Sequence, residues 1–189
     1  MQAQSLTGGF ADAPVESARA FRAILEAMAR PGTIRRVEGA APPAPLSPAA
    51  GVALLVLADP TTPLFLAGAV DCPAVRDWVA FHIGAPLAGA EEAAFAVGTW
   101  ADLQPVTRFR IGQPDYPDRS ATLIVEADRL EADGPRLTGP GIREAARLSL
   151  PETAAFQANR ALFPLGWDCI LTCGDRLAAL PRSTRLEDA

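Results

Sequence analysis

The sequence predicts an α/β fold, a single domain with a mixed β-sheet flanked by helices. Segments with helical periodicity alternate with short apolar, β-branched segments, and the chain closes with two strand-like segments joined by a Gly174-Asp175 turn. Alternating helices and strands favour parallel pairing, whereas a closing hairpin adds an antiparallel pair. With 189 residues, 49% of them hydrophobic, the chain has the size and apolar content of one domain, spanning residues 1–189.

The first predicted helix runs from Asp12 to Arg30. Asp12 followed by Pro14 is a helix-start signal. Apolar residues then recur at helical spacing, at Ala18, Phe21, Leu25 and Met28. A proline-rich connector, residues 39–48, precedes a second helix over residues 49–58. This second segment is almost wholly apolar, so we expect the helix to be buried.

Two more helices are predicted further along the chain. Pro73 begins one that ends before Gly84, and its apolar face consists of Val75, Trp78, Val79 and His82. Residues 151–163 form the other, which Pro164 ends. The strands are expected at residues 33–37, 64–66, 93–97, 120–127, 167–173 and 177–180. Residues 120–127 are β-branched and apolar over nearly their whole length, so this strand should be central in the sheet.

Composition excludes several classes of function. The formal net charge is −5, and all 17 basic residues are arginines, because the sequence contains no lysine. An acidic chain of this kind is a poor general binder of nucleic acid or of anionic membranes. Without lysine, no side chain can form a Schiff base, so covalently held pyridoxal phosphate is excluded and no cofactor is expected. The apolar stretches are too short to span a bilayer, and no secretory leader is recognisable, so we expect a cytoplasmic protein.

Cysteine usage indicates neither a disulfide framework nor a metal site. The three cysteines are Cys72, Cys169 and Cys173. An odd number in a chain of this type argues against paired disulfides. Cys169 and Cys173 fall on one predicted strand, roughly 13 Å apart at about 3.3 Å per residue, which is too far to share one ion. We expect buried thiols that pack as small apolar groups, and no bound metal.

His82 is the single histidine, so any conventional general-base mechanism would have to use it. It lies on the apolar face and in the last turn of its predicted helix. A packed imidazole that interacts with the terminal carbonyls is the favoured interpretation, and a catalytic histidine is the alternative.

A turn at Gly139-Pro140-Gly141 is the best ligand candidate. Its backbone N–H groups, with Arg143 and a helix over residues 143–148 if one forms there, would suit a phosphate or another anion. The alternative is a tight turn that needs glycine at positive φ. The spacing matches neither the dinucleotide-binding pattern nor the P-loop pattern.

Other polar clusters have simpler interpretations. The basic clusters at residues 108–110 and 182–185 are expected to be solvated surface. Asp115 and Asp118 resemble an acid–base pair, but a proline-rich loop is the better interpretation. From residue chemistry alone, the sequence predicts an α/β domain without a self-sufficient catalytic constellation.

Several segments together resemble the PhnH family of the bacterial carbon–phosphorus lyase complex, from about residue 10 to residue 184. They cover residues 10–32, 57–63, 81–87, 136–142 and 163–184. The most specific begins with Phe163-Pro-Leu-Gly166, passes into a strand and ends with Pro181-Arg182-x-Thr184. The resemblance implies a fold like the large domain of pyridoxal-phosphate-dependent transferases, without the cofactor.

The resemblance also implies a role in phosphonate catabolism. The chain would be part of a core complex that converts alkylphosphonate and ATP into α-D-ribose 1-phosphonate 5-triphosphate, with release of adenine. It would form a homodimer in isolation and bind the other core subunits in cells, with a phosphonate or ATP as a possible ligand. Two classes of function stay open: an assembly or ligand-organising subunit without catalysis of its own, and a stand-alone phosphate- or nucleotide-binding enzyme with an arginine-lined pocket.

Overall fold

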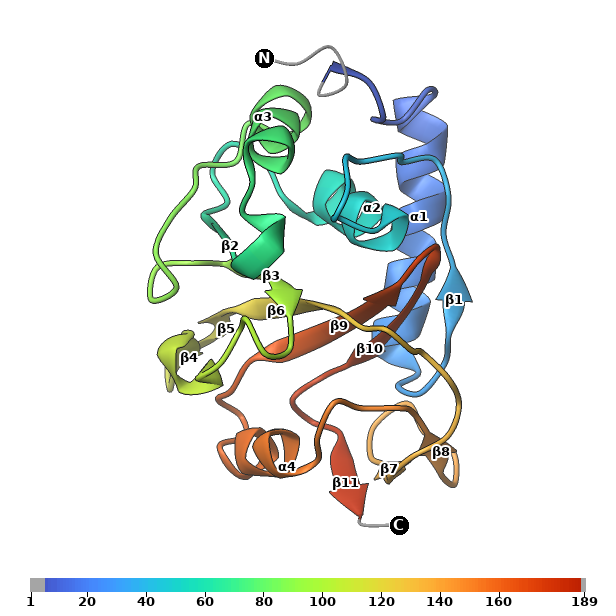
Figure 1. Ribbon diagram of the computed structural model, residues 1–189. Coiled ribbons are helices and arrows are strands. Elements are labelled where there is room, and N and C mark those ends of the chain that lie inside the picture. The colour runs from blue at the N-terminus through green and yellow to red at the C-terminus, as the bar shows by residue number, and fades with distance from the viewer. Residues whose placement is uncertain (1–5, 188–189) are drawn as a thin grey trace.

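The computed structural model describes residues 6–187, and a mixed six-stranded sheet lies at its centre (Figure 1). Four neighbouring strands run parallel to one another, and the two strands at one edge are added by antiparallel pairing. This confirms the predicted α/β class with a mixed sheet. In spatial order the strands are β1 (Arg35–Arg36), β10 (Arg176–Leu180), β9 (Asp168–Cys173), β6 (Thr122–Glu126), β3 (Phe95–Thr99) and β2 (Leu64–Leu66).

Strand β6 is an inner strand, as its composition predicts. It pairs in parallel with β3 on one side and with β9 on the other. Its side chains alternate between two cores, so that Leu123 and Val125 pack on one face of the sheet and Ile124 packs on the other. A strand covered on both faces needs apolar residues at every position, which explains its continuous apolar run.

One face of the sheet is covered by three helices, two of which lie above it in Figure 1, while the third, α1, runs along its right-hand side. They are α1 (Ala13–Ala29), α2 (Pro48–Leu57) and α3 (Pro73–His82). All three start near the predicted residues. The Ser47 hydroxyl caps α2 by accepting a hydrogen bond from the Ala50 N–H (3.2 Å). Residues 49–54 of α2 are buried between α1 and the sheet, as the apolar sequence predicts. We call these helices the helical layer.

The opposite face is covered by a mixed layer, which lies below the sheet in Figure 1. Leu137, Leu148, Phe156 and Trp167 are among the buried side chains of its core. It contains α4 (Ala154–Ala161), a three-stranded sheet of β11 (Arg185–Glu187), β7 (Arg136–Thr138) and β8 (Ala146–Arg147), a hairpin of β4 (Ile111–Gln113) and β5 (Tyr116–Ser120), and the 3₁₀ turn η3 (Val106–Arg108). A second 3₁₀ turn, η2 (Gly68–Val70), follows β2.

One prediction about this mixed layer is wrong. Residues 115–118 were expected to form a loop, but Tyr116–Ser120 is strand β5, paired with β4. The pairing shifts register at Gly112, whose φ is +82° and whose added Cβ would lie 2.6 Å from the Pro117 oxygen. Glycine at this bulge lets the two strands approach each other. The helix that could have supported an anion site after the turn at Gly139 does not form, because Ala146–Arg147 is strand β8, paired with β7.

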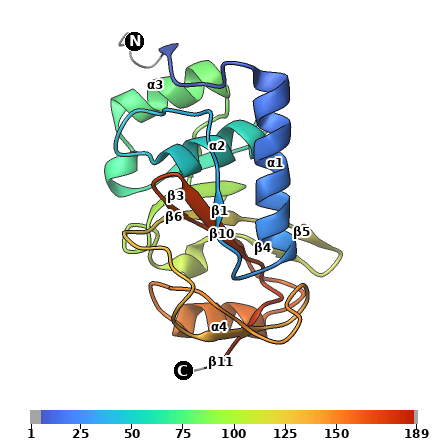
Figure 2. The same ribbon diagram turned by 90° about the vertical axis from the view of Figure 1, so that its right-hand side faces the viewer.

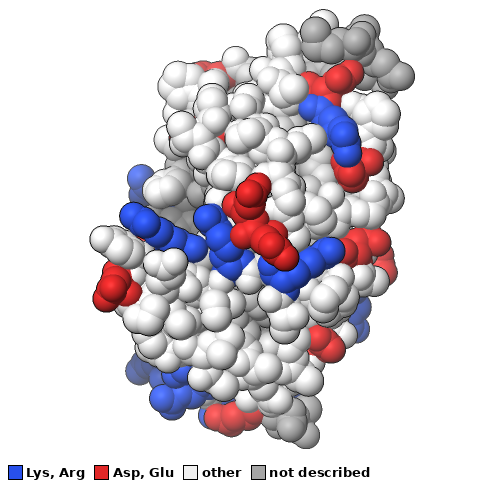
Figure 3. Space-filling view, turned by 90° about the vertical axis from the view of Figure 1, so that its left-hand side faces the viewer, with Lys and Arg blue, Asp and Glu red and all other residues white. Residues whose placement is uncertain are grey.

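Charge on the surface is mixed rather than basic on the side that Figure 3 shows. Arginines and carboxylates stand side by side in a band across the middle, and further groups of both signs lie at the upper right and along the lower edge (Figure 3). This side therefore offers no broad basic patch for a nucleic acid. Within residues 6–187, none of the helices combines the length and the apolar character that crossing a bilayer requires.

Candidate functional site

Helix α1 lies at the surface of the molecule (Figure 2), and several of its large apolar side chains are exposed. The exposed fractions are 43% for Val15, 49% for Phe21 and 54% for Leu25. The helix packs on the sheet through its other side, where Ala20, Ile24 and Ala27 are buried. We call Val15, Ala18, Phe21 and Leu25 the α1 surface. Large apolar side chains gathered on one exposed helix face are typical of protein–protein contacts.

The α1 surface continues into an open groove of about 620 Å³. Leu25 belongs to both, and Phe163, which is 49% exposed, also lines the groove. The Arg160 guanidinium lies 4.7 Å from the centre of the Phe163 ring. The groove is lined mainly by apolar residues and prolines, among them Met28, Pro140, Pro164 and Pro181. Surface and groove together form an extended apolar area, which we call the α1 groove.

Three arginines flank this apolar area. Arg19, Arg22 and Arg30 are exposed on α1 and at its end, and they form no ion pair or hydrogen bond through their side chains with a residue that the structure describes. By contrast, nearby Arg35 pairs with Glu26 (2.6 Å) and Arg36 pairs with Asp175. At 100° per residue, Arg22 and Arg19 follow Phe21 and Leu25 around the outward side of the helix. An apolar centre with free guanidinium groups beside it suits a partner that brings carboxylates.

Arg182 fixes the floor of the α1 groove, and the prediction that it is solvated surface is wrong. Its side chain is 12% exposed, and it forms a two-point ion pair with Asp168. It also donates to the Pro117 carbonyl oxygen (2.7 Å) and to the Ser120 hydroxyl. These contacts tie the chain after β10 to β9 and β5. Because the guanidinium is occupied in this way, Arg182 stabilises the fold and is not free to bind an anion.

The turn at Gly139 and Gly141 lies at the end of α1. Both glycines have positive φ, +131° and +81°, as a tight turn requires. A Cβ at Gly141 would lie 1.9 Å from the Ala29 carbonyl oxygen, so the turn packs directly on the last carbonyls of the helix. This end of a helix carries partial negative charge, which disfavours an anion. Arg143 is exposed, with no partner among residues 6–187. The anion site therefore stays a prediction without support from its surroundings.

His82 ends α3 and is half-buried. Its Nε2 lies 3.1 Å from the Thr7 carbonyl oxygen, and its ring centre lies 5.2 Å from that of Trp78. Phe81 packs edge-on against the same ring. A cavity of about 470 Å³ beside it is lined by residues 6–10 and by Leu55. These contacts fit a packing histidine, and the catalytic alternative stays a prediction.

The cysteines lie where the strand assignment puts them. Cys169 is buried and Cys173 is half-buried, both on β9, and Cys72 precedes α3. Burial raises the pKa of the Cys169 thiol far above its ordinary value, and the Asp168 carboxylate adds to this. The thiol is therefore neutral and unreactive at physiological pH. No group of three or more metal-ligating side chains occurs among residues 6–187.

Comparison with known proteins identifies the family. Residues 8–187 match the family described as "Bacterial phosphonate metabolism protein (PhnH)". The chain is 40% identical over 197 residues to the "Alpha-D-ribose 1-methylphosphonate 5-triphosphate synthase subunit PhnH" of Rhizobium meliloti (strain 1021), with 98% of each chain covered. It is 29% identical over 198 residues to the "Putative C-P lyase subunit protein HtxG" of Stutzerimonas stutzeri, with 94% of each covered. The chain therefore belongs to the PhnH family of bacterial phosphonate metabolism proteins.

Proposed function

We propose that this protein is a subunit of the carbon–phosphorus lyase core complex. In this role it helps that complex to make ribose 1-phosphonate 5-triphosphate from alkylphosphonate and ATP, and it does not catalyse a step alone. One observation carries the proposal: the chain is 40% identical, over 98% of both lengths, to a subunit of ribose 1-methylphosphonate 5-triphosphate synthase. The expected place of action is the cytoplasm.

The α1 groove supports the proposal as the surface that binds another core subunit. It is apolar in its centre and flanked by Arg19, Arg22 and Arg30, none of which has an acidic partner in the described chain. The expected partner surface has an apolar centre and carboxylates at its rim. Burying Phe21 and Leu25 in the contact removes two large apolar side chains from water, which favours association by about 1 to 2 kcal/mol for each half-exposed residue.

Co-purification with the tagged core subunits tests this assignment. Phe21→Asp places a charge in the centre of the contact and should reduce recovery at least ten-fold. Leu87→Asp is the matched control, because Leu87 is 44% exposed and lies outside the α1 groove. Both variants should melt within a few degrees of the wild type. Unchanged recovery of Phe21→Asp would remove the α1 groove from the assembly.

We also propose that the isolated chain forms a homodimer. Light scattering should give about twice the 19.8 kDa chain mass, and a mass of 19.8 kDa at micromolar concentration would contradict it. If Phe21→Asp separates the dimer into monomers but still binds the core subunits, the α1 groove is the homodimer interface and not the surface that binds another core subunit.

We propose further that the fold is related to the large domain of pyridoxal-phosphate-dependent transferases but works without the cofactor. The absence of lysine supports this, because no internal aldimine can form. Borohydride treatment in the presence of pyridoxal phosphate should leave the folded domain unlabelled. A reduced adduct on a residue within the domain would overturn the proposal.

The alternative of a stand-alone enzyme with an arginine-lined phosphate pocket has less support. One cavity is lined by two arginines, Arg19 and Arg36, but Glu16 and Glu38 line it as well. Arg36 also pairs with Asp175. Two carboxylates in the wall offset the attraction of the arginines for phosphate.

A further inference from the structure

A cavity of about 620 Å³ opens where the parallel strands β3 and β6 end. Thr99 and Glu126 are the last residues of these two strands, and they are register partners. Trp100 and Asp128, which follow them in the chain, line the cavity with them. In open α/β sheets, ligands bind at the carboxyl ends of the strands, and this volume is within the range of small-molecule sites.

The far wall of the cavity is held in place by paired loops. The Glu131 N–H donates to the Ser149 hydroxyl (2.9 Å), and the Ser149 N–H donates to the Glu131 carbonyl oxygen (2.9 Å). Gly134, with φ of +108°, lets the loops approach each other, because an added Cβ would lie 2.7 Å from the Leu148 oxygen. The cavity is therefore formed before any ligand enters.

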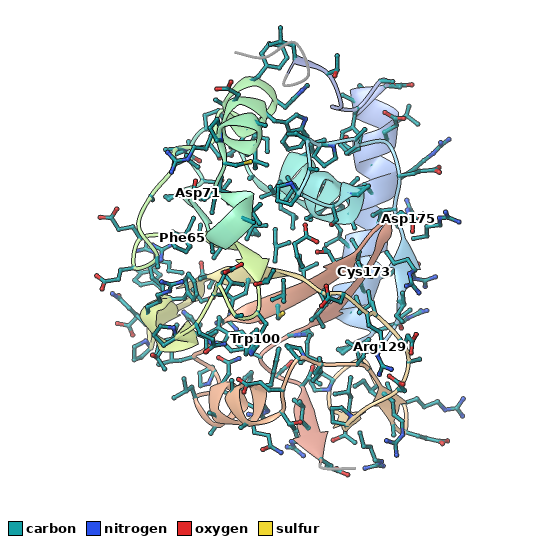
Figure 4. The ribbon with its side chains drawn as sticks, viewed as in Figure 1. Phe65, Asp71, Trp100, Arg129, Cys173 and Asp175 are labelled. Carbon is teal, nitrogen blue, oxygen red and sulfur yellow. The ribbon has the colours of Figure 1, made fainter. Side chains whose placement is uncertain are left out.

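An aromatic cluster supports the side of the cavity that follows β3. Trp100 is stacked on Phe156, with ring centres 5.1 Å apart and an angle of 16° between the rings. Phe156 in turn packs edge-on against buried Trp167 at 5.2 Å. Trp100 is thereby held as a fixed, half-buried aromatic surface, which suits the stacking of a planar ring. In Figure 4, Trp100 and Arg129 both lie below the strands, on the side of the mixed layer, and Arg129 belongs to the loop after β6.

The charges in the wall favour a neutral ligand. Asp128 brings a carboxylate to the cavity wall, and Arg129 is the one cationic residue among those that line it. Arg129 already pairs with Glu131 (3.3 Å) and Asp133 (2.7 Å) outside the cavity. A phosphate or phosphonate would therefore meet uncompensated negative charge, whereas hydroxyl groups would meet acceptors.

The carboxylate of Glu126 is turned away from this cavity. One oxygen accepts the Ser47 N–H (2.7 Å) at the start of α2, and the other accepts the Thr172 hydroxyl (2.9 Å). Glu126 alternates with Val125 along β6, so its side chain lies on the face of the helical layer, with Ile124. The Asp128 carboxylate has no hydrogen bond or ion pair with any residue between 6 and 187, so all its acceptor positions are open. A pair of hydroxyl groups is the matching donor, as when an acidic residue binds the ribose of a dinucleotide.

We propose that this cavity binds a neutral nucleoside, with the base on Trp100 and the ribose hydroxyls on the carboxylate of Asp128. The choice of ribose as the sugar rests on the proposed function, whereas the preference for an uncharged, ring-bearing ligand rests on the cavity itself. This site lies on the mixed layer and shares no lining residue with the α1 groove.

Calorimetry of the purified chain with adenosine, ATP and inorganic phosphate tests the proposal. Adenosine should bind at least ten-fold more tightly than ATP, and phosphate should not bind. Trp100→Leu should weaken adenosine binding at least ten-fold. Asp128→Asn should reduce the preference for adenosine over ATP several-fold, because it removes one negative charge. Asp115→Asn is the matched control and should change nothing, because Asp115 is an exposed carboxylate in the β4–β5 turn that lines neither this cavity nor the α1 groove.

Several outcomes would overturn the proposal: ATP or phosphate binding more tightly than adenosine, no adenosine binding at millimolar concentration, or a folded Trp100→Leu variant that binds adenosine like the wild type. Tighter binding of tetramethylammonium than of adenosine would show a cation site and would overturn it too. If Trp100→Leu does not fold, Asp128→Asn tests the proposal instead, since Asp128 is exposed, and an unchanged preference for adenosine over ATP in that variant would overturn the proposal. If adenosine does not bind but the chain still co-purifies with the core subunits, only the nucleoside site is excluded. If adenosine binds but the chain does not co-purify, only the assembly role is excluded.

Discussion

The two layers that cover the central sheet are built in different ways. The helical layer consists of three helices, each specified by a short run of neighbouring residues, and α2 is almost enclosed by its neighbours. The mixed layer is assembled from segments far apart in the sequence, such as β7 and β11, where Arg136 pairs with Glu187. Its cavity is lined by two strand ends and two loops.

The two layers therefore suit different kinds of binding partner. The helical layer presents large apolar side chains with arginines beside them on the exposed side of one regular helix, which suits contact with a protein. The mixed layer forms a concave site from convergent loops, which suits a small ligand. Four test variants, two of them with a matched control, show how far the two layers are independent, and the test variants are taken from the largest expected effect to the smallest.

Gly141→Val should have the largest effect, because Gly141 joins the two layers. A β-branched residue is strained at φ +81°, and its Cβ would overlap the Ala29 oxygen at the end of α1. We expect the free energy of unfolding to fall by about 3 kcal/mol or more. A loss below about 1 kcal/mol would show that the contact is not needed.

Arg143→Ala is the control for that turn and should change stability by less than about 0.5 kcal/mol, because the side chain is exposed. It also tests the predicted anion site. A drop in ATP or phosphonate binding of ten-fold or more, with unchanged melting, would establish that site. Unchanged binding, both in the isolated chain and in the complex, would remove the turn from the candidate sites.

Arg182→Ala should come next, because it leaves the Asp168 carboxylate without its partner in a half-buried place. The expected loss is about 2 to 4 kcal/mol in chemical denaturation. Arg185→Ala is the comparison, since Arg185 is exposed and has no side-chain partner among the described residues. Equal stability of the two variants would contradict the role given to Arg182.

His82→Ala should cost about 1 to 2 kcal/mol, because it removes the ring that packs on Trp78 and the contact with the Thr7 carbonyl. The effect should stay within the helical layer, so turnover of the assembled complex should be unchanged. A variant that melts like the wild type but abolishes turnover would establish a catalytic histidine instead.

Asp71→Asn should have the smallest effect, and the effect should depend on pH. The hydrogen bonds from Arg76 lower the pKa of the Asp71 carboxyl below 3.8. A lowered folded-state pKa stabilises the fold above the ordinary value, and this contribution is lost as the pH falls through the lowered pKa. The variant should melt slightly below the wild type at pH 7, and the difference should shrink as the pH falls below 3.8 and vanish below the lowered pKa. A difference that persists in strong acid would point to another cause.

Local signals predicted the helical layer well. Ser47 begins α2 through a hydrogen bond three residues away, and the Gly174-Asp175 turn closes the β9–β10 hairpin. The spacing of Phe21 and Leu25 predicted α1 but not its orientation, since Ala20, Ile24 and Ala27 are spaced in the same way and are the buried set. Helical periodicity thus shows that a helix exists, and only the tertiary contacts show which side is covered.

The sites were harder to predict because their residues meet only in three dimensions. Arg182 contacts Asp168, Ser120 and Pro117, which no spacing in the sequence relates to it. The cavity at the strand ends had a weak signal: Thr99-Trp100 and Glu126 lie at or just beyond predicted strands. That signal becomes informative only once β3 and β6 are known to be parallel neighbours.

The place of β9 beside β6 has a consequence for the order in which the protein is made. Thr122 of β6 pairs with Asp168 of β9, and β7, β8 and α4 lie between them in the chain. During synthesis, one edge of the most apolar strand therefore stays open until residues 168–173 have left the ribosome. A parallel pairing over such a distance also closes slowly. A nascent chain that stops before residue 168 is expected to aggregate through this edge, and co-translational binding by a chaperone would protect it.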